Sequence, residues 1–376
     1  ANYTTQYAYF DPDPEDTILT TPLVTSITQN GQNFSYTYDN VGNITSVTRN
    51  GLTTTYEYDS LGQLTRVNDP HAGKSTMYLY DCGGNMTGYL SAPYTLAPTL
   101  EGVNETVFYT YGDSNWKDKV TAIGGKAITY DAIGNPLTYD GWTFTWKAGR
   151  MLASMVKNGT NAQFTYDHNG MRIRKIVNGV TTNYTLNGKN VVHMTQGSHD
   201  LHFFYDAQGK PGMVTYNDVD YFYVYNLQGD VVALIDANGT QVVEYGYDVW
   251  GNPISKTGSL AATIGTLNPF RYRGYVYDEE TGLYYLRNRY YKPAWRRFIN
   301  SDGLISGTDD ILNKAQFTYC SNNPVMMSDG EGNWPDWGKL FSGTSLLALG
   351  LTAVAAGLSV VTSGVAAPAM VNGTKI

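Results

Sequence analysis

Cysteine is scarce in this 376-residue chain, which holds only Cys82 and Cys320. The two lie far apart in the sequence, with no CxxC motif and no paired histidine, so neither a disulfide framework nor a zinc site is indicated. We expect two free buried thiols, and a single bridge between them is the alternative.

Histidine is scarce as well, and its spacing supports no catalytic or metal site. The five histidines are His71, His168, His193, His199 and His202. None belongs to an HExxH motif, and His199 and His202 would point to opposite faces of a strand. No glycine-rich segment carries the Lys-Ser/Thr of a phosphate loop, and no GxSxG motif is present. We therefore expect no metal and no cofactor.

Positive charge is not in excess, because the formal net charge is −8. Nucleic-acid binding depends on a basic surface that releases counterions, so a nucleic-acid partner is not expected. Charged residues make up only 15% of the chain and aromatic residues make up 14%, a balance that excludes disorder and favours β structure.

Tyrosine, by contrast, is abundant, and it recurs in a fixed pattern. Nine times a tyrosine is followed by Asp or Asn and, a few positions later, by Gly. The nine are Tyr38, Tyr58, Tyr80, Tyr130, Tyr166, Tyr205, Tyr225, Tyr247 and Tyr277. Steps of 20 and 22 residues separate the first three, and the same two steps separate Tyr205, Tyr225 and Tyr247. Such self-similarity predicts a repeat array.

Each repeat has the composition of a β-hairpin. Asp can cap the turn, and Gly supplies a positive φ at little cost. A large apolar residue two places before most turn tyrosines, such as Tyr36 or Phe164, would share a sheet face with that tyrosine. We therefore interpret the 32 tyrosines as structural, and a stacking platform for sugars is the alternative. The stretch from Ser91 to Trp116 lacks a repeat and is expected to form a loop or an irregular unit.

Composition divides the chain into three parts, namely a hairpin array over 1–255, a module rich in Arg, Tyr and Asn over 256–337, and a hydrophobic segment over 338–376. No charge occurs between Lys339 and Lys375, and a charge-free stretch longer than ~20 residues is long enough to span a bilayer. For this segment a membrane-interacting helix, a buried segment and a disordered tail all stay open. The chain opens without Met inside the array, which suggests a piece of a longer polypeptide.

The second part contains an ordered series of motifs. It runs from Tyr277-Asp278-Glu279-Glu280-Thr281-Gly282 through Tyr290-Tyr291 and Arg297-Phe298 to Asn322-Asn323-Pro324-Val325. With this series, the module resembles the core domain of the RHS/YD-repeat proteins, and the upstream array resembles their YD repeats. The resemblance implies an all-β fold in which a spiralling array of YD-repeat hairpins forms part of a shell. The RHS core would be its plug, followed by a short hydrophobic helical segment.

The resemblance also implies an aspartyl-type self-cleavage. The arginine of that site falls on Arg289 and its two carboxylates on Asp302 and Asp329, with cleavage after Asn333. Within the cleavage element, Gly330 stands where the family has proline, and Asn333 stands where it has leucine. The alternative is a purely structural plug in which the same arginine and aspartates form a buried salt bridge.

Arginine and lysine gather between positions 287 and 297 of the module, among tyrosines and Trp295. We interpret this cluster as cation–π and carboxylate pairing inside the plug rather than as a polyanion site. Asp278, Glu279 and Glu280 are the expected local partners.

In function, the resemblance implies the carrier shell of a bacterial polymorphic toxin. Its partners would be a C-terminal effector domain that is absent here, upstream shell repeats of the parent chain and an immunity protein. Secretion or cell-surface display is expected, with membrane contact by residues 340–371. The alternative is a cell-surface or cell-wall-associated adhesion module that binds glycans, because teneurins use the same shell in cell adhesion.

Overall fold

The computed structural model describes residues 3–11, 21–303 and 315–333. Almost all regular structure in these ranges is β, and its largest part is one 24-stranded sheet. Each strand from β1 to β24 pairs antiparallel with the next strand along the chain, as a continuous meander. The prediction of an all-β array of hairpins is confirmed.

The bounds of this sheet, called the wall below, follow the predicted repeats. Its strands are β1 (Thr5–Tyr9), β2 (Val24–Gln29), β3 (Gln32–Tyr38), β4 (Ile44–Arg49), β5 (Leu52–Tyr58), β6 (Leu64–Asp69), β7 (Lys74–Tyr80), β8 (Met86–Pro93), β9 (Glu105–Thr110), β10 (Ala122–Ile123), β11 (Lys126–Tyr130), β12 (Pro136–Tyr139), β13 (Trp142–Lys147), β14 (Met151–Lys157), β15 (Thr160–Tyr166), β16 (Arg172–Val177), β17 (Val180–Asn187), β18 (Asn190–Gln196), β19 (His199–Tyr205), β20 (Pro211–Tyr216), β21 (Val219–Tyr225), β22 (Val231–Asp236), β23 (Gln241–Tyr247) and β24 (Pro253–Thr257). The stretch from Ser91 to Trp116, expected to form a loop or an irregular unit, holds the end of β8 and the whole of β9, which pair with each other, and residues 94–104 connect them outside the sheet.

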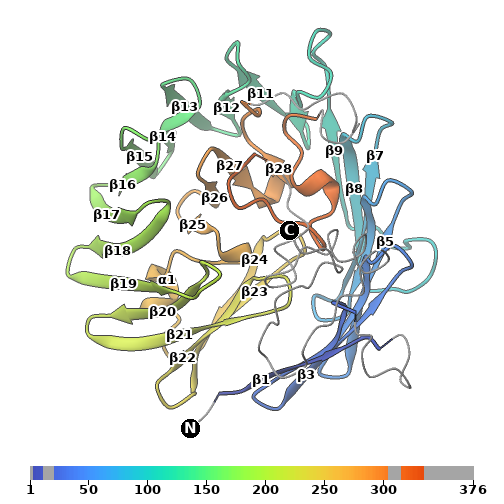
Figure 1. The fold of residues 1–376 in the computed structure, drawn as a ribbon. Coiled ribbons are helices and arrows are strands. Elements are labelled where there is room, and N and C mark those ends of the chain that lie inside the picture. Colours follow the sequence, from blue (N-terminus) through green and yellow to red (C-terminus); the bar gives the residue numbers. More distant parts are fainter. Residues whose placement is uncertain (1–2, 12–20, 304–314, 334–376) are drawn as a thin grey trace, which may run out of the picture.

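A second, four-stranded sheet lies inside the curve of the wall (Figure 1), and we call the region around it the plug. Its strands are β25 (Val276–Asp278), β26 (Leu283–Leu286), β27 (Arg289–Lys292) and β28 (Arg297–Phe298). Short helices flank it, namely α1 (Ile264–Leu267), η1 (Tyr272–Gly274), η2 (Pro293–Trp295) and η4 (Cys320–Asn322). In the described ranges no helix has the length and apolarity needed to cross a bilayer, and residues 338–376 lie outside those ranges.

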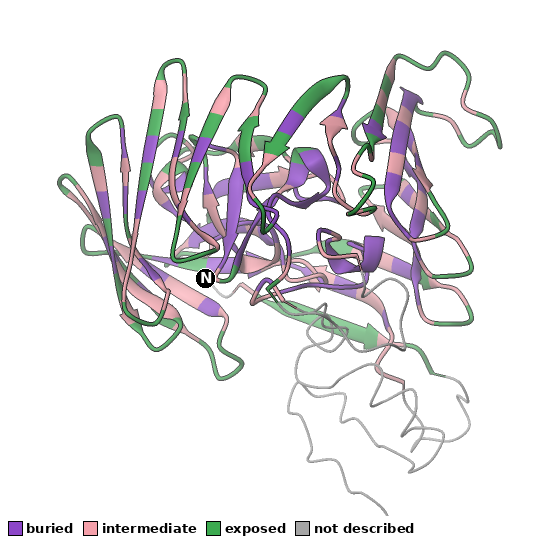
Figure 2. Cartoon of the chain, turned by 90° about the horizontal axis from the view of Figure 1, so that it is seen from above, coloured by how far each residue is buried: buried purple, intermediate pink, exposed green. Residues whose placement is uncertain are grey.

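The wall curls round the plug until its first hairpins approach its last ones (Figure 1). The side chain of Gln29, at the end of β2, donates a hydrogen bond of 2.6 Å to the carbonyl of Tyr225. Tyr3 packs against a small apolar cluster formed by Val224, Ala233 and Ile235 on β21 and β22. Buried residues accordingly gather where wall and plug meet, whereas the hairpin tips are exposed (Figure 2).

One bond type links successive repeats, and it explains why the repeat uses tyrosine rather than phenylalanine. The hydroxyl of Tyr38 donates to the carbonyl of Val24 at 2.7 Å, and the hydroxyl of Tyr58 donates to that of Ile44 at 2.7 Å. The same contact recurs at Tyr80, Tyr166, Tyr205, Tyr225 and Tyr247. The turn itself forms as predicted, with the Asp39 carboxylate accepting from the backbone N–H groups of Val41 and Asn43. Seven of the nine repeat tyrosines therefore tie their unit to the preceding one by a side-chain bond, whereas the buried hydroxyl of Tyr130 makes no hydrogen bond within the described residues.

Both cysteines are free thiols. The expectation that they are buried is right for Cys320 and wrong for Cys82, which is exposed because it lies in a repeat turn at the surface.

Candidate functional site

Two asparagines of the Asn-Asn-Pro-Val motif fasten the plug to the repeat turns of the wall. The side-chain amide of Asn322 donates to the carbonyl of Gly84 at 2.7 Å, and that of Asn323 donates to the carbonyl of Gly62 at 2.8 Å. Asn323 also donates to the side chain of Asn43, the last residue of a third turn, at 3.1 Å. Asn322 and Asn323 thus form hydrogen bonds to three consecutive repeat turns, and these bonds position the plug against the wall.

The arginine cluster of the plug lies over aromatic rings, as the sequence indicated. The guanidinium of Arg296 is 3.5 Å from the ring centroid of Tyr89, and that of Arg289 is 3.6 Å from that of Phe298. Arg297 lies 5.2 Å from the ring of Phe317. Such contacts leave the charges buried among π-faces rather than available to a polyanion.

The expected carboxylate partners of that cluster are elsewhere, and this prediction is wrong. Asp278 forms a bidentate pair with Arg172 of wall strand β16, at 2.6 and 3.1 Å, and Lys175 lies 3.2 Å away. Glu280 pairs with the same lysine, and Glu279 pairs with Lys256 and Arg271. Asp278 and Glu280 therefore bind plug and wall together across separations of 106 and 105 residues, which no local pattern reveals, whereas the partners of Glu279 are only 23 and 8 residues away.

The structure brings Arg289, Asp302 and Asp329 together, as the resemblance predicted. Arg289 is the first residue of β27, and its side chain is buried. Its Nη2 lies 3.0 Å from Oδ2 of Asp302 and 3.3 Å from Oδ2 of Asp329. One nitrogen thus faces both carboxylates, and its Nη1 also donates to the carbonyl of Gln316 at 3.0 Å.

Asn333, the residue whose peptide bond the family would cleave, lies at the same guanidinium. Its carbonyl oxygen accepts a hydrogen bond of 3.1 Å from Nη2 of Arg289. Oδ1 of Asp329 accepts from the backbone N–H groups of Gly332, at 2.7 Å, and of Asn333, at 3.0 Å. Gly332 has a φ of +72°, and a Cβ there would lie 2.6 Å from the carbonyl oxygen of Leu286, so the element passes too close to β26 for a side chain.

The two carboxyl groups of the site differ in burial. Burial raises the pKa of Asp329, against the lowering effects of Arg289 and of the backbone N–H groups. Burial likewise lowers the pKa of Arg289, and the charges of Asp302 and Asp329 oppose this lowering. Asp302 is more exposed than Asp329, at 11% against 2% of the side chain. A buried carboxyl whose pKa is raised, beside a second carboxyl and a carbonyl held by a guanidinium, is suited to hydrolysis of that peptide bond.

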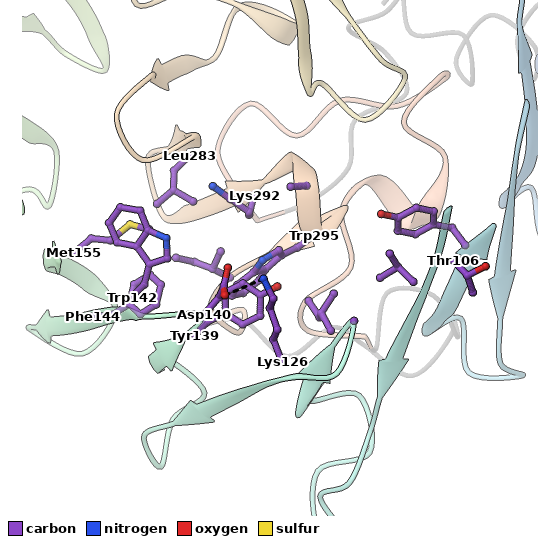
Figure 3. A pocket seen from close by; sticks show the side chains of 16 residues that line it. Thr106, Lys126, Tyr139, Asp140, Trp142, Phe144, Met155, Leu283, Lys292 and Trp295 are labelled. Carbon is purple, nitrogen blue, oxygen red and sulfur yellow. Dashed lines mark ion pairs between the residues drawn. The ribbon is translucent and has the colours of Figure 1, made fainter. Parts of the chain in front are cut away.

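A cavity of about 480 Å³ lies between the plug and the wall strands β8 to β14 (Figure 3). Trp295 of the plug packs edge-on against Tyr139 of the wall, with ring centroids 4.6 Å apart. Asp140 pairs with Lys126 at 2.8 Å, and Lys292 reaches in from β27. The sequence offered no signal for this cavity because its lining comes from segments about 150 residues apart.

Lys292 provides a pH-dependent test of the packing between plug and wall. Burial, with Lys157 nearby, lowers its pKa from 10.5 to about 8. The unfolded chain binds this proton more tightly, so stability rises as pH increases through the window from about 8 to 10.5. Replacing Lys292 with Met is expected to add about 1–3 kcal/mol at pH 7 and to flatten that rise. Urea midpoints at pH 7 and at a pH within the window measure both effects.

The exposed Lys117 offers a matched control, because Lys117→Met should leave the urea midpoint and its pH dependence unchanged. An equal pH slope in Lys292→Met and in the unmodified chain would show that the amine at position 292 is solvated in the folded protein.

Comparison with known proteins agrees with this architecture. A family model described as Teneurin YD-shell matches residues 24–325. The tRNA nuclease WapA of Bacillus subtilis is 36% identical over 264 residues, which cover 68% of this chain and 11% of WapA. Toxin subunit YenC1 of Yersinia entomophaga is 25% identical over 300 residues, which cover 69% of this chain and 29% of that subunit. The chain spans only a small part of the length of these relatives.

Solved structures show the same fold. The Tc holotoxin pore of Photorhabdus luminescens superposes with a TM-score of 0.64 at 19% identity, over 90% of this chain and 18% of that chain. The crystal structure of TcdB2-TccC3 without its hypervariable C-terminal region gives 0.65 at 20% identity, over 88% and 18%. At these identities the likeness concerns the fold alone.

Proposed function

Because the chain belongs to the teneurin YD-shell family and so to the RHS/YD-repeat proteins, we propose that it is the carrier shell of a bacterial polymorphic toxin. It would hold or deliver a C-terminal effector of the parent chain. The observation that carries the proposal is the bond from buried Arg289 to the carbonyl of Asn333, the residue after which the effector portion would begin. A wall curled round a plug supports a container role (Figure 1).

The proposal keeps the division of the chain into a hairpin array over 1–255, an RHS core module over 256–337 and a hydrophobic segment over 338–376 that leads to the effector, and the last wall strand, β24, runs across the first boundary to Thr257. Upstream repeats of the parent chain would extend the wall, and an immunity protein would neutralise the effector in the producing cell. Secretion or cell-surface display follows from this role. Membrane contact belongs to residues 340–371, which lie outside the described ranges.

Self-cleavage after Asn333 is part of the proposal. The Asp302 carboxylate would take a proton from water as that water attacks the carbonyl carbon of Asn333. Arg289 would stabilise the negative charge that develops on the carbonyl oxygen, which it already binds. Asp329, whose pKa burial raises, would hold the proton that passes to the leaving amine of Trp334 as the peptide bond breaks.

A protease-protection experiment on the purified parent chain tests the carrier function. On a denaturing gel we expect a large fragment ending at Asn333 and a separate effector fragment. In the native state, the effector fragment should survive added trypsin, and it should be digested once denaturant opens the wall. A trypsin site inserted into the exposed loop at 94–104 is the positive control, because it should be cut in the native state.

Two results would contradict the carrier function. One is digestion of the effector fragment in the native parent chain as fast as digestion of the free effector. The other is a signal on a glycan array that disappears when outward-facing tyrosines are replaced, because an adhesion module needs an exposed binding face rather than a closed interior.

A further inference from the structure

The outer face of the wall carries a group of side chains that the plug site does not use. Strands β18 and β19 are neighbours in the wall (Figure 1). His193 on β18 lies opposite His202 on β19 in the strand register, and Asp200 is two residues before His202 on the same strand. Residues two apart on a strand share a face. The alternate positions Met194 and Leu201 are buried, so the three polar side chains project outward.

The three side chains converge on one point. Nε2 of His193 lies 2.9 Å, and Nε2 of His202 lies 3.0 Å, from the same oxygen, Oδ1 of Asp200. The two imidazole rings are stacked, with centroids 4.3 Å apart and planes 13° from parallel. The nearest ligand atoms of the three residues all lie within 4.8 Å of one another.

These distances are close to those of a metal site. In a tetrahedral zinc centre with bonds of about 2.0–2.2 Å, neighbouring ligand atoms are about 3.3 Å apart. The two distances from imidazole nitrogen to carboxylate oxygen are already near that value. Small rotations of the exposed imidazoles would adjust the third distance, which is the one between the two Nε2 atoms. Two imidazoles and one carboxylate form a ligand set that borderline divalent cations prefer, whereas Ca²⁺ and Mg²⁺ prefer oxygen ligands alone.

We propose that His193, Asp200 and His202 form a binding site for a borderline divalent cation, with Zn²⁺ as its representative. The side chains are 28%, 51% and 54% exposed in that order, which leaves an entry path from solvent. With three protein ligands, one position of a tetrahedral ion stays open to water or to an outside ligand. The ion would join β18 to β19 on the outside of the shell. Without it, Nε2 of His193 and Oδ1 of Asp200 share a hydrogen bond of 2.9 Å, so this contact needs no ion to exist.

Titration of the full, untagged chain with zinc chloride tests whether this cluster binds an ion or is only a hydrogen-bonded surface group. The chain carries Cys82→Ser in every sample, because the exposed thiol is a competing ligand. Isothermal titration calorimetry at neutral pH should show one saturable Zn²⁺ site. His193→Gln and His202→Gln should each lower the affinity for Zn²⁺ by at least about 10–100-fold. Loss of a residue that only supports a metal ligand already has an effect of that size.

His199→Gln is the matched control. It lies on the same strand on the opposite face, where its Nδ1 pairs with the hydroxyl of Tyr216 at 2.9 Å. This variant should bind Zn²⁺ as the unmodified chain does. If the double variant His193→Gln/His202→Gln takes up Zn²⁺ with unchanged affinity and stoichiometry, or if the unmodified chain shows no saturable uptake, the proposal is wrong. All substitutions in the site are at the surface, and thermal unfolding of each variant verifies its fold.

Discussion

Replacing Asp278 with Ala is expected to destabilise the folded chain by about 3–5 kcal/mol, the cost of leaving a buried partner charge unpaired. The side chain of Asp278 is fully buried, and that of Arg172 is 1% exposed. Burial alone would raise the pKa of Asp278, but the charges of Arg172 and Lys175 hold it below its usual value. The carboxylate is therefore ionised in the folded protein, and its loss leaves Arg172 without an anion.

Chemical denaturation measures this loss as a shift of the urea midpoint at constant slope. Glu280→Ala is the matched control, because Glu280 pairs with the neighbouring Lys175 but is 34% exposed, and exposed pairs contribute about 0–1 kcal/mol. Equal midpoints for the two variants would show that the Arg172–Asp278 pair does not fasten the plug to the wall.

The pH dependence of the same pair has a definite sign. Because the folded-state pKa of Asp278 is lowered, its stabilising contribution is present above the unfolded pKa of 3.8 and is lost as pH falls through the folded value. The difference in stability between Asp278→Ala and the unmodified chain should therefore shrink under acid conditions.

The wall could be predicted from sequence because its determinants are local. Alternation with period two and a turn of Asp or Asn followed by Gly in each repeat place Tyr36 and Tyr38 on one strand without any knowledge of distant residues. The bond from the Tyr38 hydroxyl to Val24 was not predicted, because it requires the spacing between successive units in space. A signal for it was present all the same, since every repeat uses tyrosine where phenylalanine would bury equally well.

Contacts across long separations could not be read from the sequence. Arg172 and Asp278 are 106 residues apart, and nothing near either one indicates the other. Arg289, Asp302 and Asp329 were found only through a family resemblance. His193 and His202 are an intermediate case, because they are opposite each other in one hairpin, and counting back from its turn at Gly197 would have paired them.

The remaining large effect concerns self-cleavage of the parent chain. Asp302→Asn and Asp329→Asn are each expected to slow release of the effector fragment about 10²–10⁴-fold, the usual contribution of a general acid or base. The second substitution keeps an oxygen that can accept from Gly332 and Asn333, so the cleavage element should retain its shape. Quantification of the intact chain against time by denaturing gel, with fragment masses, gives the rates.

A pH profile separates a catalytic role from a structural one. Hydrolysis needs one ionised and one protonated carboxyl, so the rate should pass through a maximum, with the alkaline limb set by the raised pKa of Asp329. Glu331→Gln is the matched control, because Glu331 lies two residues from Asp329 yet is 44% exposed and pairs with Lys189 and Arg287. It should cleave at the unmodified rate. A parent chain that stays intact at every pH would leave Arg289 and its two aspartates as a buried ion pair that positions the plug, and the carboxylates would then contribute to stability rather than to release.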